Sequence, residues 1–185
     1  MKPYIYIIYF LIFSLNSMAQ EQIKAKRKAK EITYNAIEWP TGPNRVIYRN
    51  VRNKLSNERW VRAKKYSSPE FEQTPFFDKA NDPRENVYKI IAESLSLKKI
   101  QELQVEKPSP FLGLYFDYPG SLLEMEIIID KNSTLTVQDI ESIETNLKAK
   151  LKVNFTSPFL EGSNFIPVSF GIDPKRILAF KLSGR

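Results

Sequence analysis

The residue types that most often carry enzymatic chemistry are missing from this chain, which contains no histidine and no cysteine. Nucleophilic catalysis by a Ser-His or Cys-His pair is therefore excluded. Zinc, copper and non-haem iron are usually held by imidazole or thiolate ligands, so the sequence predicts no transition-metal site and no cofactor. Chemistry by paired carboxylates, by serine with lysine, by tyrosine or by arginine remains open.

Two short patterns could hold such chemistry. Ser96 and Lys99 have the spacing with which a lysine activates a serine nucleophile in exported acyltransferases. The companion motifs of penicillin-binding enzymes are missing, so we interpret Ser96 as a helix cap with solvated lysines beside it. Residues 130–133 could offer oxygen ligands to calcium, but they lack EF-hand spacing and are interpreted as a turn.

Paired carboxylates come from one predicted strand. Glu124 and Glu126 are two residues apart, so both side chains lie on the same face. Alternation with apolar neighbours explains the pair as the solvent face of a strand. A hydrolase of envelope polysaccharide would need two such groups about 5 to 9 Å apart. We keep this hydrolase as an alternative function, with Asp117, Glu124, Glu126 and Asp130 as its candidate acids.

The strongest functional pattern is a basic segment interleaved with aromatic residues. Residues 20–65 contain thirteen Lys or Arg against four Glu, a net charge of +9, whereas residues 66–185 contain fourteen against seventeen acids, a net of −3. This asymmetry favours an anionic partner, attracted by the cations and anchored by the rings. The candidate ligand-binding residues are Arg45, Arg49, Arg52, Arg59, Trp60, Arg62 and Tyr66.

The anionic partner could belong to several classes. Phosphate contacts combined with base stacking would suit a nucleic acid. Because the chain also carries an export signal, an anionic envelope component or an acidic protein is favoured over nucleic acid. Phe71, Phe76 and Phe77 would add apolar anchors from the proline-rich segment 67–83. The structural interpretation is that the arginines are merely the solvated face of an edge hairpin.

The N-terminal residues predict export. Lys2 precedes an apolar run of twelve residues over 4–15, and a small-x-small pattern follows at 16–20. Residues 1–19 therefore have the form of a secretory signal peptide that is cleaved after Ala19. The run is shorter than the roughly 20 residues of a spanning helix, so we predict no transmembrane anchor after cleavage. The expected location is the periplasm, the outer surface or the medium.

The elements that must position these residues follow from apolar spacing. We expect a basic arm over 20–31 and a single domain over 32–185. Helices are predicted over 84–104 and 137–151, and a Pro-Gly turn at 118–121 joins two central strands. The predicted strands are 45–51, 59–66, 112–117, 122–130, 152–155, 166–172 and 177–182, the first two forming a hairpin or lying as two neighbouring strands. The sequence predicts an α+β fold in which an antiparallel sheet packs against two or three helices.

The order of these segments resembles that of small exported proteins of unknown function from Bacteroidota. The resemblance is carried by the signal peptide ending in Met18-Ala19-Gln20, the helical region 85–103, the hairpin ending in Ile129-Asp130-Lys131, and residues 136–155. It implies no catalytic residues. The resulting hypothesis is a non-enzymatic binding or accessory module of the envelope, and a structural subunit of an envelope complex is a further alternative.

Overall fold

The fold is a mixed sheet-and-helix domain, seen in a computed structural model that describes residues 28–29, 32–40, 44–61, 76–77, 79 and 82–184. Six antiparallel strands form a sheet of order β1-β2-β3-β5-β4-β6. The strands are β1 Lys28–Ala29, β2 Ile32–Glu38, β3 Arg45–Asn50, β4 Phe111–Phe116, β5 Leu122–Asp130 and β6 Ile166–Gly171. The helices are α3 Arg84–Ser94, α4 Leu97–Val105, α5 Val137–Lys150 and α6 Pro174–Ser183, with short 3-10 turns η1 Leu55–Asn57 and η3 Pro158–Leu160. The predicted α+β class is confirmed.

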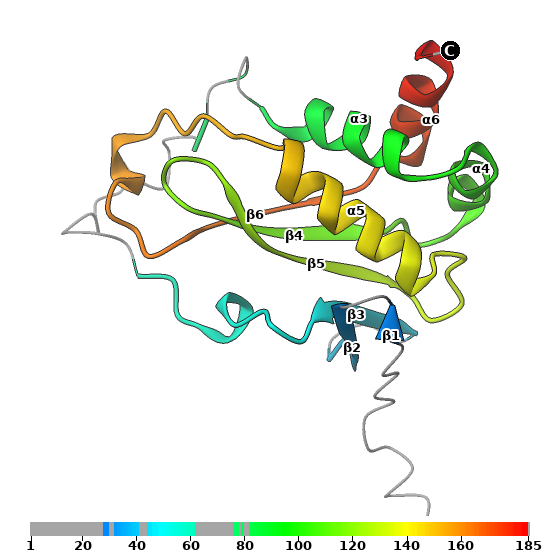
Figure 1. Ribbon diagram of the computed structural model, residues 1–185, viewed down its shortest axis with the longest axis horizontal. Helices are drawn as coiled ribbons and strands as arrows, with labels where there is room; N and C mark the ends of the chain where they lie inside the picture. The colour runs from blue at the N-terminus through cyan, green and yellow to red at the C-terminus, as the bar shows by residue number, and fades with distance from the viewer. Residues whose placement is uncertain are drawn as a thin grey trace, which may run out of the picture.

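The hydrophobic core lies between one face of the sheet and the helices, which gather on that side (Figure 1). Leu114 of β4 and Met125 and Ile127 of β5 are fully buried, as are Ile91 of α3 and Leu147 of α5. Each such side chain contributes about 1.5–3 kcal/mol of transfer free energy. These contacts pack α5 against β5. The polar cleft described below lies between the same two elements.

Helix α5 begins and ends where its sequence predicts. Thr136 and Asp139 form a reciprocal capping box, in which each side chain accepts from the other's backbone N–H. Lys148 and Lys150 lie in the last turn, where the partial negative charge of the helix end favours cations. The predicted helical region 84–104 is present as two helices, α3 and α4, so both helical predictions are confirmed.

The predicted placement of 45–51 beside 59–66, as a hairpin or as neighbouring strands, is wrong. Strand β3 instead pairs with β2 on one side and β5 on the other, with Ile47 opposite Ile37 and Ile128. Both edges of β3 are thus occupied, and residues 59–61 continue the chain without strand pairing. Residues 62–66 lie outside the described residues.

The C-terminal strand predicted over 177–182 is also wrong, because these residues belong to helix α6. Asp173 caps the helix by accepting from the Lys175 N–H at 3.0 Å, and Pro174 occupies the first turn, where its missing N–H costs nothing. The helix start at Asp173-Pro174 outweighs the strand preference of the β-branched and aromatic residues that follow it. Of the strand predicted over 152–155, only one bridge forms, between Ser121 and Lys152.

Candidate functional site

Two of the predicted binding arginines make internal contacts. Arg45 donates from Nη2 to the Ser109 carbonyl at 2.7 Å, which ties β3 to the segment before β4. Arg49 donates from Nη2 to Glu126 Oε2 at 2.7 Å, and Tyr115 donates to the other oxygen of Glu126 at 3.2 Å. Both charged side chains of this pair are only 14% exposed. These two arginines therefore stabilise the outer face of the sheet.

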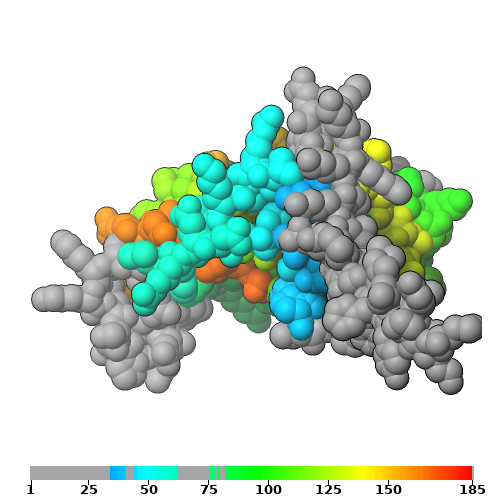
Figure 2. All heavy atoms as spheres, turned by 90° about the horizontal axis from the view of Figure 1, so that it is seen from below, coloured from blue at the N-terminus to red at the C-terminus, as the bar shows by residue number. Residues whose placement is uncertain are grey.

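Other predicted residues lie on the segment that follows β3. Arg52 and Arg59 are exposed, and neither guanidinium has an acidic partner among the described residues. Trp60 is half-buried and contacts Phe76 edge to face, with ring centroids 5.8 Å apart. Figure 2 shows this segment, in cyan, running across one face of the molecule. The side-chain amide of Asn164 hydrogen-bonds to the backbone of residues 59 and 61. Arg62, Tyr66 and Phe71 lie outside the described residues, while Phe77 packs against the core.

The candidate acids of the hydrolase alternative have separate local partners. Glu124 accepts from the backbone N–H groups of Lys54 and Leu55 at 2.8 and 2.9 Å. Asp117 accepts from the Ser121 N–H at 2.6 Å, and Asp130 from the Asn132 N–H at 2.8 Å. Glu124 and Glu126 share a strand face, as predicted, but each accepts hydrogen bonds from groups of the protein itself.

The Ser96 and Lys99 pair has the structural role that the sequence favours. Ser96 accepts from the Lys99 N–H at 3.2 Å and so caps α4. The Lys99 ammonium turns away to donate to the Thr134 carbonyl at 2.5 Å and lies 3.4 Å from Glu102. A serine nucleophile activated by this lysine is therefore not assembled.

A polar cleft that the sequence did not predict lies between α5 and the ends of β3 and β5. Its volume is about 240 Å³. Glu144, which is 1% exposed, accepts from the Tyr34 hydroxyl and lies 2.7 Å from the Lys148 ammonium. The cleft is lined by Asn50, Arg52, Asn53, Leu123, Glu124, Glu144, Thr145 and Lys148. One of these lining residues, Arg52, is among the predicted binding arginines.

The sequence carries a signal for this buried carboxylate, although it is easily overlooked. Glu144 is four residues after Ile140 and three before Leu147, so it lies within the apolar stripe of α5. An unpaired buried carboxylate would be costly. The pairing of Tyr34 with Asn50 between β2 and β3 places the phenol beside the helix, where it supplies the missing donor.

Burial raises the pKa of the Tyr34 phenol, and the adjacent Glu144 charge raises it further. Burial likewise raises the pKa of Tyr115, with a further contribution from Glu126. Both phenols therefore keep their protons in the folded state at pH values where an unfolded chain loses them.

We predict that stability falls as pH rises above about 10, the ordinary tyrosine pKa. Above that value the unfolded chain binds fewer protons than the folded chain, which makes the pH slope of the unfolding free energy negative. The free energy of unfolding, measured in urea at pH 9 and pH 11, should fall less between the two pH values for Tyr115→Phe than for the unchanged chain. An equal fall in both proteins would contradict the raised pKa of Tyr115.

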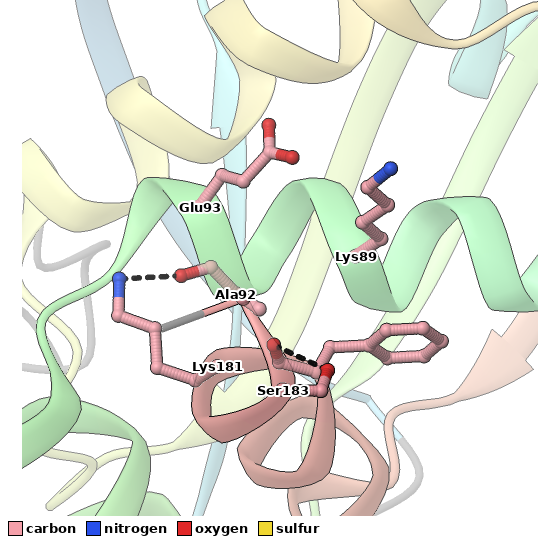
Figure 3. Close-up of a pocket in the computed structure, with 7 residues that line it drawn as sticks. Lys89, Ala92, Glu93, Lys181 and Ser183 are labelled. Atoms are coloured by element: carbon pink, nitrogen blue, oxygen red, sulfur yellow. Dashed lines mark hydrogen bonds between the residues drawn. The ribbon is translucent and has the colours of Figure 1, made fainter.

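A larger groove of about 630 Å³ lies between α3 and α6. Figure 3 shows Lys181 reaching back to the Ala92 carbonyl, a bond of 2.8 Å, and Ser183 bonded to the Phe180 carbonyl. Glu93 pairs with Lys150 at 2.7 Å. Lys89 also lines the groove and makes no hydrogen bond or ion pair with another described residue, so its ammonium is the group that this groove leaves available to a ligand.

The described residues contain no cluster of three or more acidic, histidine or cysteine side chains that could hold a metal ion. Within the same part of the chain, no helix has both the length and the apolar character needed to cross a membrane.

Comparison with known proteins identifies a fold but no activity. A solved structure of a DUF5043 family protein from Bacteroides uniformis ATCC 8492 is similar to this chain with a TM-score of 0.62. The two share 16% sequence identity over 83% of this chain and 89% of the other. That protein is an uncharacterised protein from the Bacteroidota, the bacterial group whose small exported proteins this chain resembles in its order of segments. No family model matches the sequence, and no curated protein matches it.

Proposed function

We propose that this protein is an exported, non-catalytic binding module that recognises an anionic glycan of the cell envelope. The observation that carries the proposal is the exposure of Arg52 and Arg59 on one surface segment without acidic partners among the described residues. The same segment exposes two valines, Val51, which precedes Arg52 and is 45% exposed, and Val61, which is two residues after Arg59 and 56% exposed. Exposed cations beside apolar surface suit an amphipathic anionic chain.

Export is part of the same proposal and is supported by the signal-like residues 1–19 alone. The absence of cysteine is compatible with any compartment, since the packed core needs no disulfide. An anionic envelope glycan is therefore a partner that the protein would meet in the location its N-terminus predicts.

The hydrolase alternative receives less support from the geometry. Glu124 and Glu144 do line one cleft, but Glu124 accepts backbone hydrogen bonds and Glu144 is paired with Tyr34 and Lys148. A glycosidase needs one carboxyl group that donates a proton and another that attacks or activates water. Neither carboxylate of this cleft is left without a protein partner to do so.

Reversing the charge of the exposed arginines should weaken binding to heparin, which serves as a polyanionic glycan probe. In the full chain, Arg52→Glu combined with Arg59→Glu should lower the affinity about tenfold at low salt and reduce its salt dependence. Binding would be measured by isothermal titration at several ionic strengths. The matched control is Lys98→Glu with Lys175→Glu, which changes the net charge equally at exposed positions on α4 and α6.

The outcome separates a specific surface from general attraction to a basic protein. Loss of affinity in the arginine variant alone supports the proposal. Equal losses in both variants would show that only net charge matters and would overturn it, as would retention of full affinity in the arginine variant.

A further inference from the structure

We infer that the polar cleft between α5 and the ends of β3 and β5 binds a small oxyanion, a phosphate monoester or a carboxylate carried on a body of monosaccharide size. The inference deepens the proposed function, because Arg52 belongs both to the cleft and to the exposed basic segment. It rests on which hydrogen-bonding groups of the cleft are already engaged and which are available.

The acceptors of the cleft are engaged by protein donors. One oxygen of Glu144 accepts from Tyr34, and the other makes no hydrogen bond but lies 2.7 Å from the Lys148 ammonium as an ion pair. Both oxygens of Glu124 accept from backbone N–H groups. The Asn50 side-chain oxygen accepts from the Arg52 N–H at 3.0 Å. A ligand that offers mainly donors would therefore find few partners.

The donors of the cleft are largely available. Among the described residues, no hydrogen bond is made by the Arg52 guanidinium, the Thr145 hydroxyl or the Asn50 side-chain N–H₂. The Lys148 ammonium makes one ion pair and is 35% exposed, which leaves two of its three N–H groups for other acceptors. A ligand rich in acceptors, such as an oxyanion, matches this set.

Volume limits the size of the ligand. A cleft of about 240 Å³ has room for about eight water molecules at the volume that each occupies in the liquid. A free phosphate would leave much of it empty, whereas a sugar phosphate or a sugar acid would fill it.

Charge limits the strength and the salt dependence of binding. The two cations Arg52 and Lys148 are balanced by Glu124 and Glu144, so recognition depends on short hydrogen bonds. We therefore expect an affinity on the order of 1 mM to 0.1 mM that changes little with ionic strength, unlike heparin binding.

The test is an NMR titration of the full ¹⁵N-labelled chain with glucose 6-phosphate, glucuronate and neutral glucose. The two anionic sugars should produce saturable shifts at the amides of Asn50, Arg52, Thr145 and Lys148, and glucose should produce none. Comparison of the two anions shows which oxyanion, phosphate or carboxylate, is preferred. Non-saturating shifts, or equal shifts with glucose, would overturn the inference.

Variants decide whether the cleft is responsible. Thr145→Val should weaken sugar phosphate binding at least about threefold through loss of one hydrogen bond and leave heparin affinity unchanged. Lys150→Gln on the same helix is the control, since Lys150 pairs with Glu93 and does not line the cleft. Arg59→Glu should weaken heparin binding only. If the sugar anions fail to bind while heparin still depends on Arg59, the cleft inference fails and the proposed function stands.

Discussion

Replacing Gly120 with alanine should lower the free energy of unfolding by about 3–4 kcal/mol. Gly120 follows the turn between β4 and β5 with a φ of 86°, a conformation that costs a residue with a Cβ atom. That Cβ would lie 1.7 Å from the Val153 carbonyl oxygen. The chain must therefore move, and the 3.0 Å bond from the Val153 N–H to the Gly120 carbonyl would be lost.

Gly171→Ala in β6 provides the matched control. A Cβ at Gly171 would have no heavy atom within 4 Å, and its φ is not positive. Urea unfolding of both variants should show a large loss for Gly120→Ala and a change within about 0.5 kcal/mol for Gly171→Ala. Similar midpoints for the two variants would refute the proposed clash.

Removing the Tyr34 hydroxyl should destabilise the protein by about 2 kcal/mol, because it leaves an oxygen of buried Glu144 without its donor. The same substitution at Tyr88 is the control. Its hydroxyl donates to the carbonyl of exposed Gly171 at 3.3 Å, a longer bond to a neutral acceptor that water can reach. Tyr88→Phe should therefore cost less than about 1 kcal/mol.

A double variant separates the lost bond from lost packing. Tyr34→Phe combined with Glu144→Leu removes the donor and the buried charge together, and the half-exposed Lys148 can turn to solvent. Such a replacement of both partners by apolar groups can be nearly neutral. The double variant should be more stable than the sum of the single losses implies, measured by a double-mutant cycle in urea. Additive losses would show that the Tyr34–Glu144 contact contributes little.

Local structure could be predicted where neighbouring residues are enough to determine it, as in helix caps, strands and turns. The Thr136–Asp139 capping box starts α5, and runs of apolar residues mark β4 and β5. The turn between them forms one residue earlier than the Pro-Gly pair suggests, with Tyr118 and Pro119 at its centre and a bond from the Gly120 N–H to the Asp117 carbonyl. The cap of α6 by Asp173 was equally local, yet the β-forming residues that follow it led to the wrong prediction.

The choice of strand partners depended on tertiary structure. The segment 59–66 has the residue types of a strand, but both edges of β3 are taken by β2 and β5, and no local signal records this. The basic segment was recognisable from composition. Composition did not show which of its arginines make internal contacts and which are exposed. Arg49 faces Glu126 because two strands distant in sequence pair in register, while Arg52 lies beyond the end of that pairing and stays exposed.

The polar cleft also depends on contacts between distant segments, which the sequence alone did not predict. The sequence determines that α5 carries a carboxylate within its apolar stripe, and it determines the exclusion of histidine and cysteine chemistry. Only the packing of β2 against α5 decides that Glu144 meets Tyr34, and only the end of β3 brings Arg52 beside Thr145 and Lys148. Helix caps and alternation act over a few neighbouring residues, but a binding site is assembled from residues that become neighbours when the chain folds.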